Sequence, residues 1–369
     1  MSPTTSSTTQ HDAGVGSAVA GRPTTMRAAT HARYGDAVDV IELRDVDVPQ
    51  PTADEVLIEV AASSLNAIDH HYVTGTPYPL RLMSGFRTPQ RSIVGADVAG
   101  TVVATGSDVT GFSVGDDVVA LVNGGGCARF VATTTAGMTL RPTTVSIDDA
   151  ASTPVAGLTA IQGLLKHAGL RAGERVLVNG AAGGVGTFAV QIAAAAGAHV
   201  TAVCSGRNVE MVRALGADHV IDYTQADVAD EVERTGERFD VVFDNVGNRP
   251  ARTLARMLTG SGRVVLTTGP KSSRLLGPIR HMLTTRLSFL FRSAAFTSFV
   301  AEASADDLER LIQMIDSGAI RPAIDRVVGI DGVADGLAEI ATGHTRAKIV
   351  VHPTESSGEA AGSGVADGG

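Results

Sequence analysis

Short apolar runs separated by glycine and proline dominate the first third of the chain. They include VLIEVAA at 56–62, DVAGTVVATG at 97–106 and DDVVALV at 116–122. Valine-rich runs of this length, bounded by turn residues, are typical of the strands of a small β domain. We therefore predict that residues 26–150 form a β-rich domain.

The pattern changes after residue 150, where strand-like runs alternate with segments of helical character. The predicted strands are 175–180, 199–205, 219–222, 239–247 and 262–269, and the predicted helices are 184–196, 207–215, 226–235 and 249–258. Such alternation predicts βαβ units and a parallel sheet within residues 151–300. A helix (305–317), a strand (321–330), a helix (331–342) and a strand (348–353) follow, and residues 301–353 are expected to return to the first domain.

Both ends of the chain lack residues that could be buried. Residues 1–25 and 354–369 consist mainly of Ser, Thr, Gly and Ala, and are predicted to be disordered because burial cannot offset their ordering entropy. The first tail has no secretory apolar run, and Arg22 is its only basic residue, so a role as a transit peptide stays open. No run of 18 apolar residues occurs, and we expect a cytoplasmic protein without a membrane span.

Composition narrows the possible functions. The length of 369 residues suits two domains, and a net charge of −9 argues against a general nucleic-acid binder. Two cysteines, Cys127 and Cys204, exclude a disulfide framework and a four-cysteine zinc lobe. Cys127 falls within a predicted strand, and a buried, inert thiol is a better interpretation of it than a nucleophile.

The most informative segment is RVLVNGAAGGVG at 175–186, where a predicted strand runs into a glycine-rich turn and then a helix. This is the dinucleotide fingerprint with Ala182 in place of its second glycine, and alanine is small enough to let the backbone approach a pyrophosphate. The helix amides would face the phosphates. The predicted cofactor contacts are Gly180, Ala182, Gly183, Gly184, Val185 and Gly186.

The end of the second strand of this unit indicates which dinucleotide binds. A site for NAD usually carries an acid there to bond the ribose 2′-hydroxyl, but this chain has Ser205 and Arg207 and no acid. Ser205 can donate to a 2′-phosphate and Arg207 can pair with it, which predicts NADPH as the cofactor. The alternative is that Arg207 is a solvated residue in the first turn of the next helix.

Taken together, the motifs make the chain resemble a zinc-independent medium-chain dehydrogenase/reductase of the quinone oxidoreductase-like branch. The segments that carry the resemblance are SLNAIDHHYVTG (64–75), IVGADVAGTVVATGSDVTGFSVGDDV (93–118), PVAGLTAIQGL (154–164), VNGAAGGVGTFAVQIA (178–193), LGADHVIDY (215–223) and RAKIVV (346–351). The resemblance implies a Rossmann doubly wound parallel sheet inserted in a β-rich, GroES-like catalytic domain, with the active site in the cleft. It also implies a homodimer.

Zinc-dependent members of this family place Cys, a Gly-His-Glu string and a second Cys or His around a catalytic zinc. Here the first position reads Asn66 and the string reads Gly95-Ala96-Asp97, so no metal is predicted. The adjacent His70 and His71 are poorly spaced for joint chelation. Without a Lewis acid, reduction of an activated acceptor, a quinone or an α,β-unsaturated carbonyl, is easier than oxidation of a simple alcohol.

By resemblance, Asn66, Asp69 and Tyr72 line the cleft as candidate catalytic residues, and Thr159 lies beside the nicotinamide. Asn66 could donate to a developing oxyanion and Tyr72 could donate a bond or a proton, whereas Asp69 is a better candidate for a loop anchor. Each could instead only stabilise its loop. Further cofactor contacts are predicted at Tyr223, Asn245, Val246, Thr268, Gly269 and Lys348.

A basic segment is the remaining unusual feature. No Asp or Glu occurs between Asp244 and Glu302, whereas nine Arg or Lys do, and four Phe fall within 289–299. The segment could steer an anionic cofactor or substrate, could contact a membrane surface through residues 274–299, or could use its Phe side chains to roof the pocket or fill a dimer interface.

Two functions compete with an NADPH-dependent quinone or enone reductase. One is an alcohol dehydrogenase or carbonyl reductase acting on simple carbonyls, against which the missing metal ligands argue. The other is a protein that binds the cofactor with little turnover, since a cofactor site alone does not establish an active enzyme.

Overall fold

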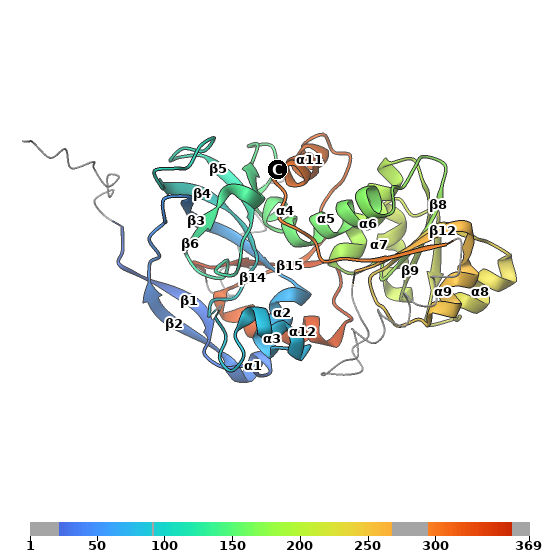
Figure 1. Ribbon diagram of the computed structural model, residues 1–369, viewed down its shortest axis with the longest axis horizontal. Helices are drawn as coiled ribbons and strands as arrows, with labels where there is room; N and C mark the ends of the chain where they lie inside the picture. Colours follow the sequence, from blue (N-terminus) through green and yellow to red (C-terminus); the bar gives the residue numbers. More distant parts are fainter. Residues whose placement is uncertain (1–21, 91, 268–293, 356–369) are drawn as a thin grey trace, which may run out of the picture.

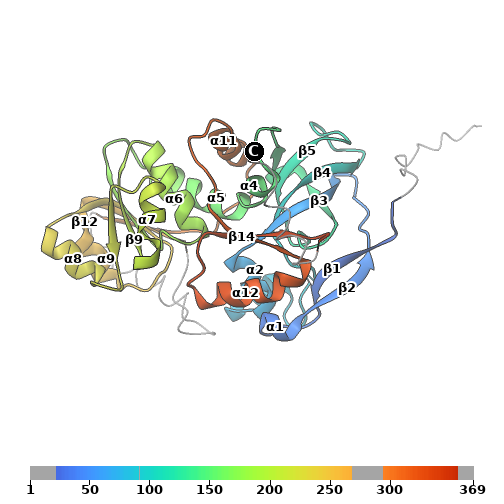
Figure 2. The ribbon, with the colours of Figure 1, turned by 180° about the vertical axis from the view of Figure 1, so that it is seen from behind.

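The computed structural model describes residues 22–90, 92–267 and 294–355, and it contains two large sheets at opposite ends of the long axis (Figure 1). One sheet holds the early strands and the last two strands of the chain, and the other holds the strands between them. Helices α5 and α6 lie between the two sheets in both views (Figures 1 and 2).

The catalytic-domain sheet has the order β14-β15-β3-β4-β5-β7, and β6 pairs with β3. Its strands are β3 (Glu55–Leu65), β4 (Asp97–Thr105), β5 (Asp117–Leu121), β6 (Phe130–Thr134), β7 (Met138–Leu140), β14 (Ile324–Gly329) and β15 (Lys348–His352). Strand β15 pairs antiparallel with β3 although more than 280 residues separate them, so the chain does return to its first domain. A separate antiparallel hairpin is formed by β1 (Thr25–His31) and β2 (Ile41–Asp47).

The second sheet is parallel throughout and has the order β10-β9-β8-β11-β12-β13, which is the strand order of a Rossmann fold. Its strands are β8 (Arg175–Asn179), β9 (His199–Cys204), β10 (His219–Asp222), β11 (Phe239–Asp244), β12 (Leu258–Leu266) and β13 (Ala295–Ser298). The predicted doubly wound parallel sheet, inserted in a β-rich domain, is therefore confirmed.

Alternate residues of the parallel strands face two different helical layers. Val176 and Val178 of β8 belong to the core that contains Phe188 of α6, whereas Leu177 belongs to the core of α8 and α9. The helices are α1 (Ala37–Val40), α2 (Ala67–Thr74), α3 (Arg81–Ser84), α4 (Ile147–Ala151), α5 (Pro154–Ile161), α6 (Gly184–Ala195), α7 (Val209–Ala214), α8 (Val228–Thr235), α9 (Ala251–Met257), α11 (Ala305–Asp316) and α12 (Val333–Thr342). Because both faces of the sheet are covered, its strands are almost continuously apolar.

One buried core extends across both halves of the molecule. It contains Ala62 and Val119 of the catalytic-domain sheet, Leu158 of α5 and Phe243 of the parallel sheet. Within the described parts of the chain, no helix is long and apolar enough to cross a membrane.

Several local predictions need correction. Residues 22–25 are ordered, because Arg22 donates to the Val103 carbonyl and Thr25 begins β1, so the predicted first tail is too long. The predicted second tail is also too long, since the Glu355 carbonyl accepts from the Ile330 amide. Cys127 is buried as predicted, but it lies in a loop and not in a strand, because the preceding glycines turn the backbone through positive φ. Strand β12 begins at Leu258, four residues before the predicted start.

The basic segment is described only in part, since residues 268–293 lie outside the described ranges. Its last residues form the edge strand β13, and the Phe299 ring packs 4.2 Å from the His167 ring within the same chain. Arg249 and Arg263 pair with Asp227 and Glu174. Membrane contact through 274–299 stays a prediction.

The contact between α6 and the end of β8 generates the first testable prediction. A Cβ added at Gly186 would lie 2.1 Å from the Gly180 carbonyl oxygen and 2.7 Å from the Ala181 Cα, and backbone atoms cannot rotate away. Gly186→Ala should therefore lower the free energy of unfolding by about 1–3 kcal/mol. At Gly183 the nearest atom to an added Cβ is 3.7 Å away and φ is −84°, so Gly183→Ala should change the free energy of unfolding by less than about 1 kcal/mol. Urea denaturation of both variants measures the difference, and equal effects would contradict the argument.

Candidate functional site

The glycine-rich turn lies at the carboxyl end of β8, where ligands bind in sheets of this kind. Gly180 has φ +80°, a left-handed conformation that glycine adopts without strain, and α6 begins at Gly184. A Cβ at Gly180 would lie 2.9 Å from Cγ2 of Val246, which follows β11. The structure thus brings the predicted glycine turn and the predicted contact Val246 together.

The start of the last strand packs directly on this turn. The Ala347 amide donates to the Ala182 carbonyl at 2.8 Å, and Ala347 adopts φ 50°, a conformation uncommon for a residue with a Cβ. A Cβ on Gly184 would lie 2.9 Å from Cδ of Lys348, so the stem of that lysine covers the first residue of α6. Lys348, predicted to contact the cofactor, therefore borders the phosphate turn with its aliphatic part.

The ammonium group of Lys348 points into the catalytic domain and is buried there. Its Nζ donates to Oδ1 of Asn66 at 2.5 Å, to Oδ2 of Asp97 at 3.1 Å and to the Leu65 carbonyl at 3.3 Å. The side chains of Lys348 and Asp97 are 2% and 0% exposed, so this is a fully buried ion pair. A buried pair of this kind is favourable only when its hydrogen bonds are satisfied, as they are here.

These contacts fix the orientation of the Asn66 amide. A lysine ammonium only donates and an ionised carboxylate only accepts, so Oδ1 must face Lys348 and Nδ2 must face Asp97, at 2.8 Å. The same Nδ2 also donates to the Ser64 carbonyl at 3.3 Å. Both N–H groups of Asn66 are thus directed at partners within the protein, and donation to a substrate, as predicted, would require one of these bonds to open.

Asp69 is a second buried carboxyl group close to Asn66, and its Oδ2 accepts from the backbone N–H of Asn66 at 2.9 Å. Burial and the neighbouring Asp97 carboxylate raise the pKa of Asp69 from 3.8 to about 7, although the Asn66 backbone and Lys348 act in the opposite direction. Asp69 anchors the start of α2, as its interpretation as a loop residue predicted. Burial also raises the pKa of the nearby Cys127 thiol, which keeps it in the unreactive protonated form.

Asp97 also holds the helix that enters the parallel domain. Its Oδ1 accepts from the Val155 amide in the first turn of α5 at 2.8 Å, which satisfies a free donor and places negative charge at the positive end of that helix. Thr159 lies one turn later, half-buried, with its hydroxyl donating to the Val155 carbonyl. The Asp97 carboxylate therefore fixes the position of both the Asn66 side chain and the first turn of α5, the helix that carries Thr159.

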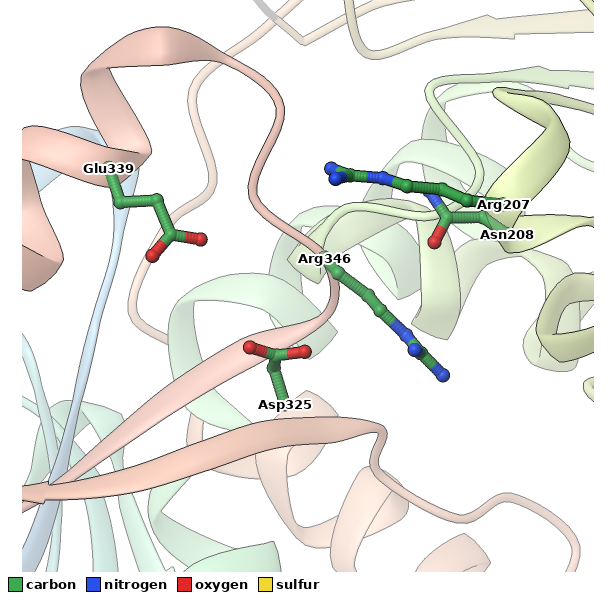
Figure 3. Close-up of a pocket in the computed structure, with 5 residues that line it drawn as sticks. All are labelled: Arg207, Asn208, Asp325, Glu339 and Arg346. Carbon is green, nitrogen blue, oxygen red and sulfur yellow. The ribbon is translucent and has the colours of Figure 1, made fainter.

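A second polar region lies beyond the end of β9, in a pocket of about 250 Å³ lined by Arg207, Asn208, Asp325, Glu339 and Arg346 (Figure 3). The figure shows that Arg207 and Arg346 come from different segments of the chain and that their guanidinium groups point in different directions. Arg207 donates to the His344 carbonyl at 2.7 Å, and Nε of Arg346 lies 3.2 Å from Sδ of Met211.

The charges of this pocket are unevenly compensated. Asp325 and Glu339 both pair with Arg326, whereas neither Arg207 nor Arg346 forms an ion pair with a carboxylate in the described parts of the chain. The buried Asn208 donates to Oγ of Ser205 at 3.1 Å, and its Oδ1 has no hydrogen-bond partner among the described residues. Two cationic groups and a free acceptor fit a phosphorylated ribose, with its anionic phosphate and its hydroxyl donors.

Asp222, at the end of β10, is a carboxylate on the other side of this region. A Cβ on Gly206 would lie 2.6 Å from its Oδ2, and hydrogen bonds from Thr224 and from the Gly206 backbone lower the pKa of Asp222. This negative charge opposes an anion near Gly206. The sequence did not draw attention to it because it follows the third strand and not the second.

The remaining predicted residues are dispersed. Asn245 accepts from the Thr267 hydroxyl at 2.6 Å, Tyr223 is 45% exposed beyond β10, and Tyr72 lies half-buried on α2. Thr268 and Gly269 lie outside the described residues. The catalytic role of Tyr72 and the cofactor role of Tyr223 stay predictions.

Comparison with known proteins identifies the family. Residues 52–201 match the alcohol dehydrogenase GroES-like domain family, and residues 215–351 match the zinc-binding dehydrogenase family. The chain is 34% identical over 340 residues to a chloroplast envelope quinone oxidoreductase homolog of Arabidopsis thaliana. The alignment covers 89% of this chain and 98% of the relative. The chain belongs to the quinone oxidoreductase branch of the medium-chain dehydrogenases/reductases.

Other members of the family support the same assignment. A 2-methylene-furan-3-one reductase of Solanum lycopersicum is 32% identical over 345 residues, covering 90% of this chain and 80% of that protein. The solved quinone oxidoreductase of Coxiella burnetii superposes with a TM-score of 0.77 at 27% identity, covering 89% and 99% of the two chains. The predicted family, the GroES-like domain and the oxidoreductase class are thereby confirmed.

Some dehydrogenases of this superfamily hold zinc, but the residues of this one do not fit the ion. The positions of the usual zinc ligands hold Asn66, Ala96 and Asp97. The Asp97 carboxylate already forms an ion pair with the Lys348 ammonium. In the part of the chain that the structure describes, no three His, Cys, Asp or Glu side chains are grouped to hold a metal. A cation bonded to the only carboxylate of this set competes directly with a metal ion.

Sequence reasoning missed three functional candidates: Asp97, Asn208 and Arg346. In the sequence Asp97 stands out only as part of the string that replaces a metal motif, although an acid in a buried, apolar strand indicates a polar partner. Arg346 lies in the recognised RAKIVV segment, but no local pattern indicates that it lies opposite Arg207. Asn208 gave no separate signal beside Arg207.

The raised pKa of Asp69 generates a prediction about stability. Asp69 holds its proton in the folded protein up to about pH 7 but loses it near pH 4 when unfolded, so its contribution to stability is present at low pH and is lost as the pH rises through about 7. Asp69→Asn keeps an acceptor for the Asn66 amide and removes the titration. The urea midpoint of this variant relative to the wild type should rise between pH 5 and pH 8.

The matched control for this measurement is Asp45→Asn, which removes an exposed carboxylate of β2. Its midpoint relative to the wild type should stay nearly constant over the same range. A constant difference for Asp69→Asn as well would show that Asp69 is ionised throughout and would contradict the prediction.

Proposed function

We propose that this oxidoreductase uses NADPH to reduce a quinone or an α,β-unsaturated carbonyl compound, without zinc. The observation that carries the cofactor assignment is the pair Arg207 and Arg346, which face one pocket at the end of β9 without carboxylate partners in the described chain. Cationic groups in this place bind a 2′-phosphate through charge-assisted hydrogen bonds, which are stronger than their bonds to an uncharged 2′-hydroxyl.

The dinucleotide fits the residues that would hold it. Gly186 packs closely against Gly180 and Ala181, which holds the start of α6 against the glycine turn. The first backbone amides of a helix have no acceptor within the helix, so phosphate oxygens can accept hydrogen bonds from them. Ser205, Arg207, Asn208 and Arg346 would hold the phosphorylated ribose. The helix dipole of α6 adds to the attraction, since Gly184 to Gly186 contribute no negative charge.

When bound, the reduced nicotinamide supplies the hydride for the reaction. Thr159 on α5 and the wall formed by Asn66 and Lys348 would hold the nicotinamide on its two sides. Burial of that wall would keep water away from the reacting atoms, and an Asn66 N–H that opened its bond to Ser64 would donate to negative charge developing on an acceptor oxygen. A conjugated acceptor delocalises that charge onto its oxygen and so needs no metal ion.

The relatives of the chain support the acceptor class. They are quinone oxidoreductases and a reductase whose named substrate carries a methylene group conjugated to a ketone. A quinone and such an enone both accept hydride at one end of a conjugated system. In both, the negative charge then develops on the carbonyl oxygen at the other end.

Cofactor preference tests the role of the two arginines. Charge-assisted hydrogen bonds contribute about 1.5–3 kcal/mol each, so Arg207→Gln/Arg346→Gln should raise the KM for NADPH by at least about tenfold and leave the KM for NADH nearly unchanged. The control is Arg256→Gln, which removes an exposed charge on α9. Equal changes for both cofactors would mean that the arginines do not contact a 2′-phosphate.

The acceptor is tested by following NADPH absorbance with quinones, enones and simple aldehydes, each with and without a chelator. We expect turnover with quinones or enones that the chelator does not reduce. Chelator-sensitive reduction of simple aldehydes alone would favour a metal-dependent carbonyl reductase.

A further inference from the structure

The side chain of Lys348 physically connects the phosphate turn with the catalytic wall. Its Cδ lies against Gly184, where an added Cβ would be only 2.9 Å away, and its Nζ reaches Asn66, Asp97 and the Leu65 carbonyl. The residue before it is fixed to the same turn by the hydrogen bond from the Ala347 amide to the Ala182 carbonyl. A displacement of the turn must therefore move the anchoring point of the Asn66 amide.

Asp97 completes this connection on the other side. Its Oδ2 accepts from Oγ of Ser64 at 2.5 Å, from Asn66 and from Lys348, and its Oδ1 accepts from the Val155 amide. The donors come from β3, from the residue before α2, from β15 and from the first turn of α5. These are the elements that carry the wall of the cleft and the helix of Thr159.

Stability alone does not account for a buried pair with this arrangement. An apolar pair of similar volume stabilises a core as well as a buried ion pair does, or better. What an ion pair adds is direction, because each of its hydrogen bonds admits a narrow range of positions for its partner. Here those directions hold Asn66 and Val155 relative to the glycine turn.

We propose that Lys348 and Asp97 are positioning residues that couple occupation of the glycine turn by the dinucleotide to the placement of Asn66 and α5 across the cleft. The inference rests on the proposed binding of NADPH. When the turn is occupied, its motion and that of Ala347 are restricted, and the Lys348 stem transmits the restriction to the buried hydrogen bonds. The first turn of α2, which begins after Asn66, then becomes more rigid.

The test uses the full-length double variant Lys348→Met/Asp97→Asn. Methionine keeps the unbranched stem against Gly184, and asparagine keeps an acceptor for the Val155 amide. Because the two substitutions together remove both charges, the double variant leaves no buried charge of this pair without its partner. The single variant Lys348→Met does leave one, and it should be much less stable than the double variant. Comparable melting curves of the double variant and the wild type establish that the fold is retained.

The first measurement is amide hydrogen exchange with and without saturating NADPH. In the wild type, NADPH should slow exchange at least fivefold both at 184–195 and at 66–73. In the double variant the protection at 184–195 should remain, with a Kd for NADPH within about threefold of the wild-type value, and the protection at 66–73 should disappear. This readout requires binding alone and no turnover.

The second measurement separates kcat from KM on the best acceptor. The double variant should lose at least tenfold in kcat while the KM for NADPH changes less than about threefold. The matched control is Lys166→Met/Asp307→Asn, which removes an ion pair with a 2.6 Å contact between α11 and the π-helical segment Gln162–His167 that follows α5. It should preserve both the exchange pattern and kcat.

Persistence of the protection at 66–73 in the double variant would overturn the coupling, as would its absence in the wild type while NADPH binds. Unchanged kcat in the double variant would reduce the pair to a structural role. Failure of the proposed function looks different: the wild type would bind NADPH and show the relayed protection, but would reduce no acceptor.

Discussion

The Asp97 carboxylate is the constraint on which the arrangement of the cleft depends. It is fully buried on a central strand of the catalytic sheet, and an ionised carboxylate in that place must have its charge and its lone pairs satisfied. Lys348 supplies the charge, and Ser64, Asn66 and Val155 supply further donors. Because these donors belong to segments far apart in the chain, satisfying one side chain also brings those segments into register.

The two ends of the proposed dinucleotide site use charge in different ways. Around Asn66 the charges of Lys348 and Asp97 are buried and paired, so they define positions. Beyond β9 the side chains of Arg207 and Arg346 are exposed, and Asp222 lies near Gly206 with the opposite sign. Salt weakens the attraction and repulsion of these exposed groups for an anion, whereas the buried ion pair is protected from screening.

The sequence predicted those features that are encoded by neighbouring residues. The strand–turn–helix at 175–195 and the alternation that follows it are local patterns, and the structure reproduces them within one or two residues at most ends. The hairpin of β1 and β2 and the helices α2, α4 and α5 were not predicted from their own residues, since they are short and their stability comes from packing. Contacts such as Lys348 with Asp97, or Arg346 opposite Arg207, join positions more than 130 residues apart. No local pattern encodes them, and the resemblance identified the segments without indicating which atoms meet.

The buried core that continues from Ala62 and Val119 through Leu158 to Phe243 has a consequence for the modularity of this architecture. The parallel domain is an insertion in the sequence, and the core of Leu177, α8 and α9 is its own, but the core on the α6 face of its sheet continues into the host domain. Gly157 of α5, where an added Cβ would lie 2.9 Å from Leu311 of α11, shows how closely the junction is fitted. Grafting the nucleotide-binding half of another dehydrogenase onto this catalytic half would therefore create a mismatched seam, and a working chimera would have to inherit α5 and α11 together.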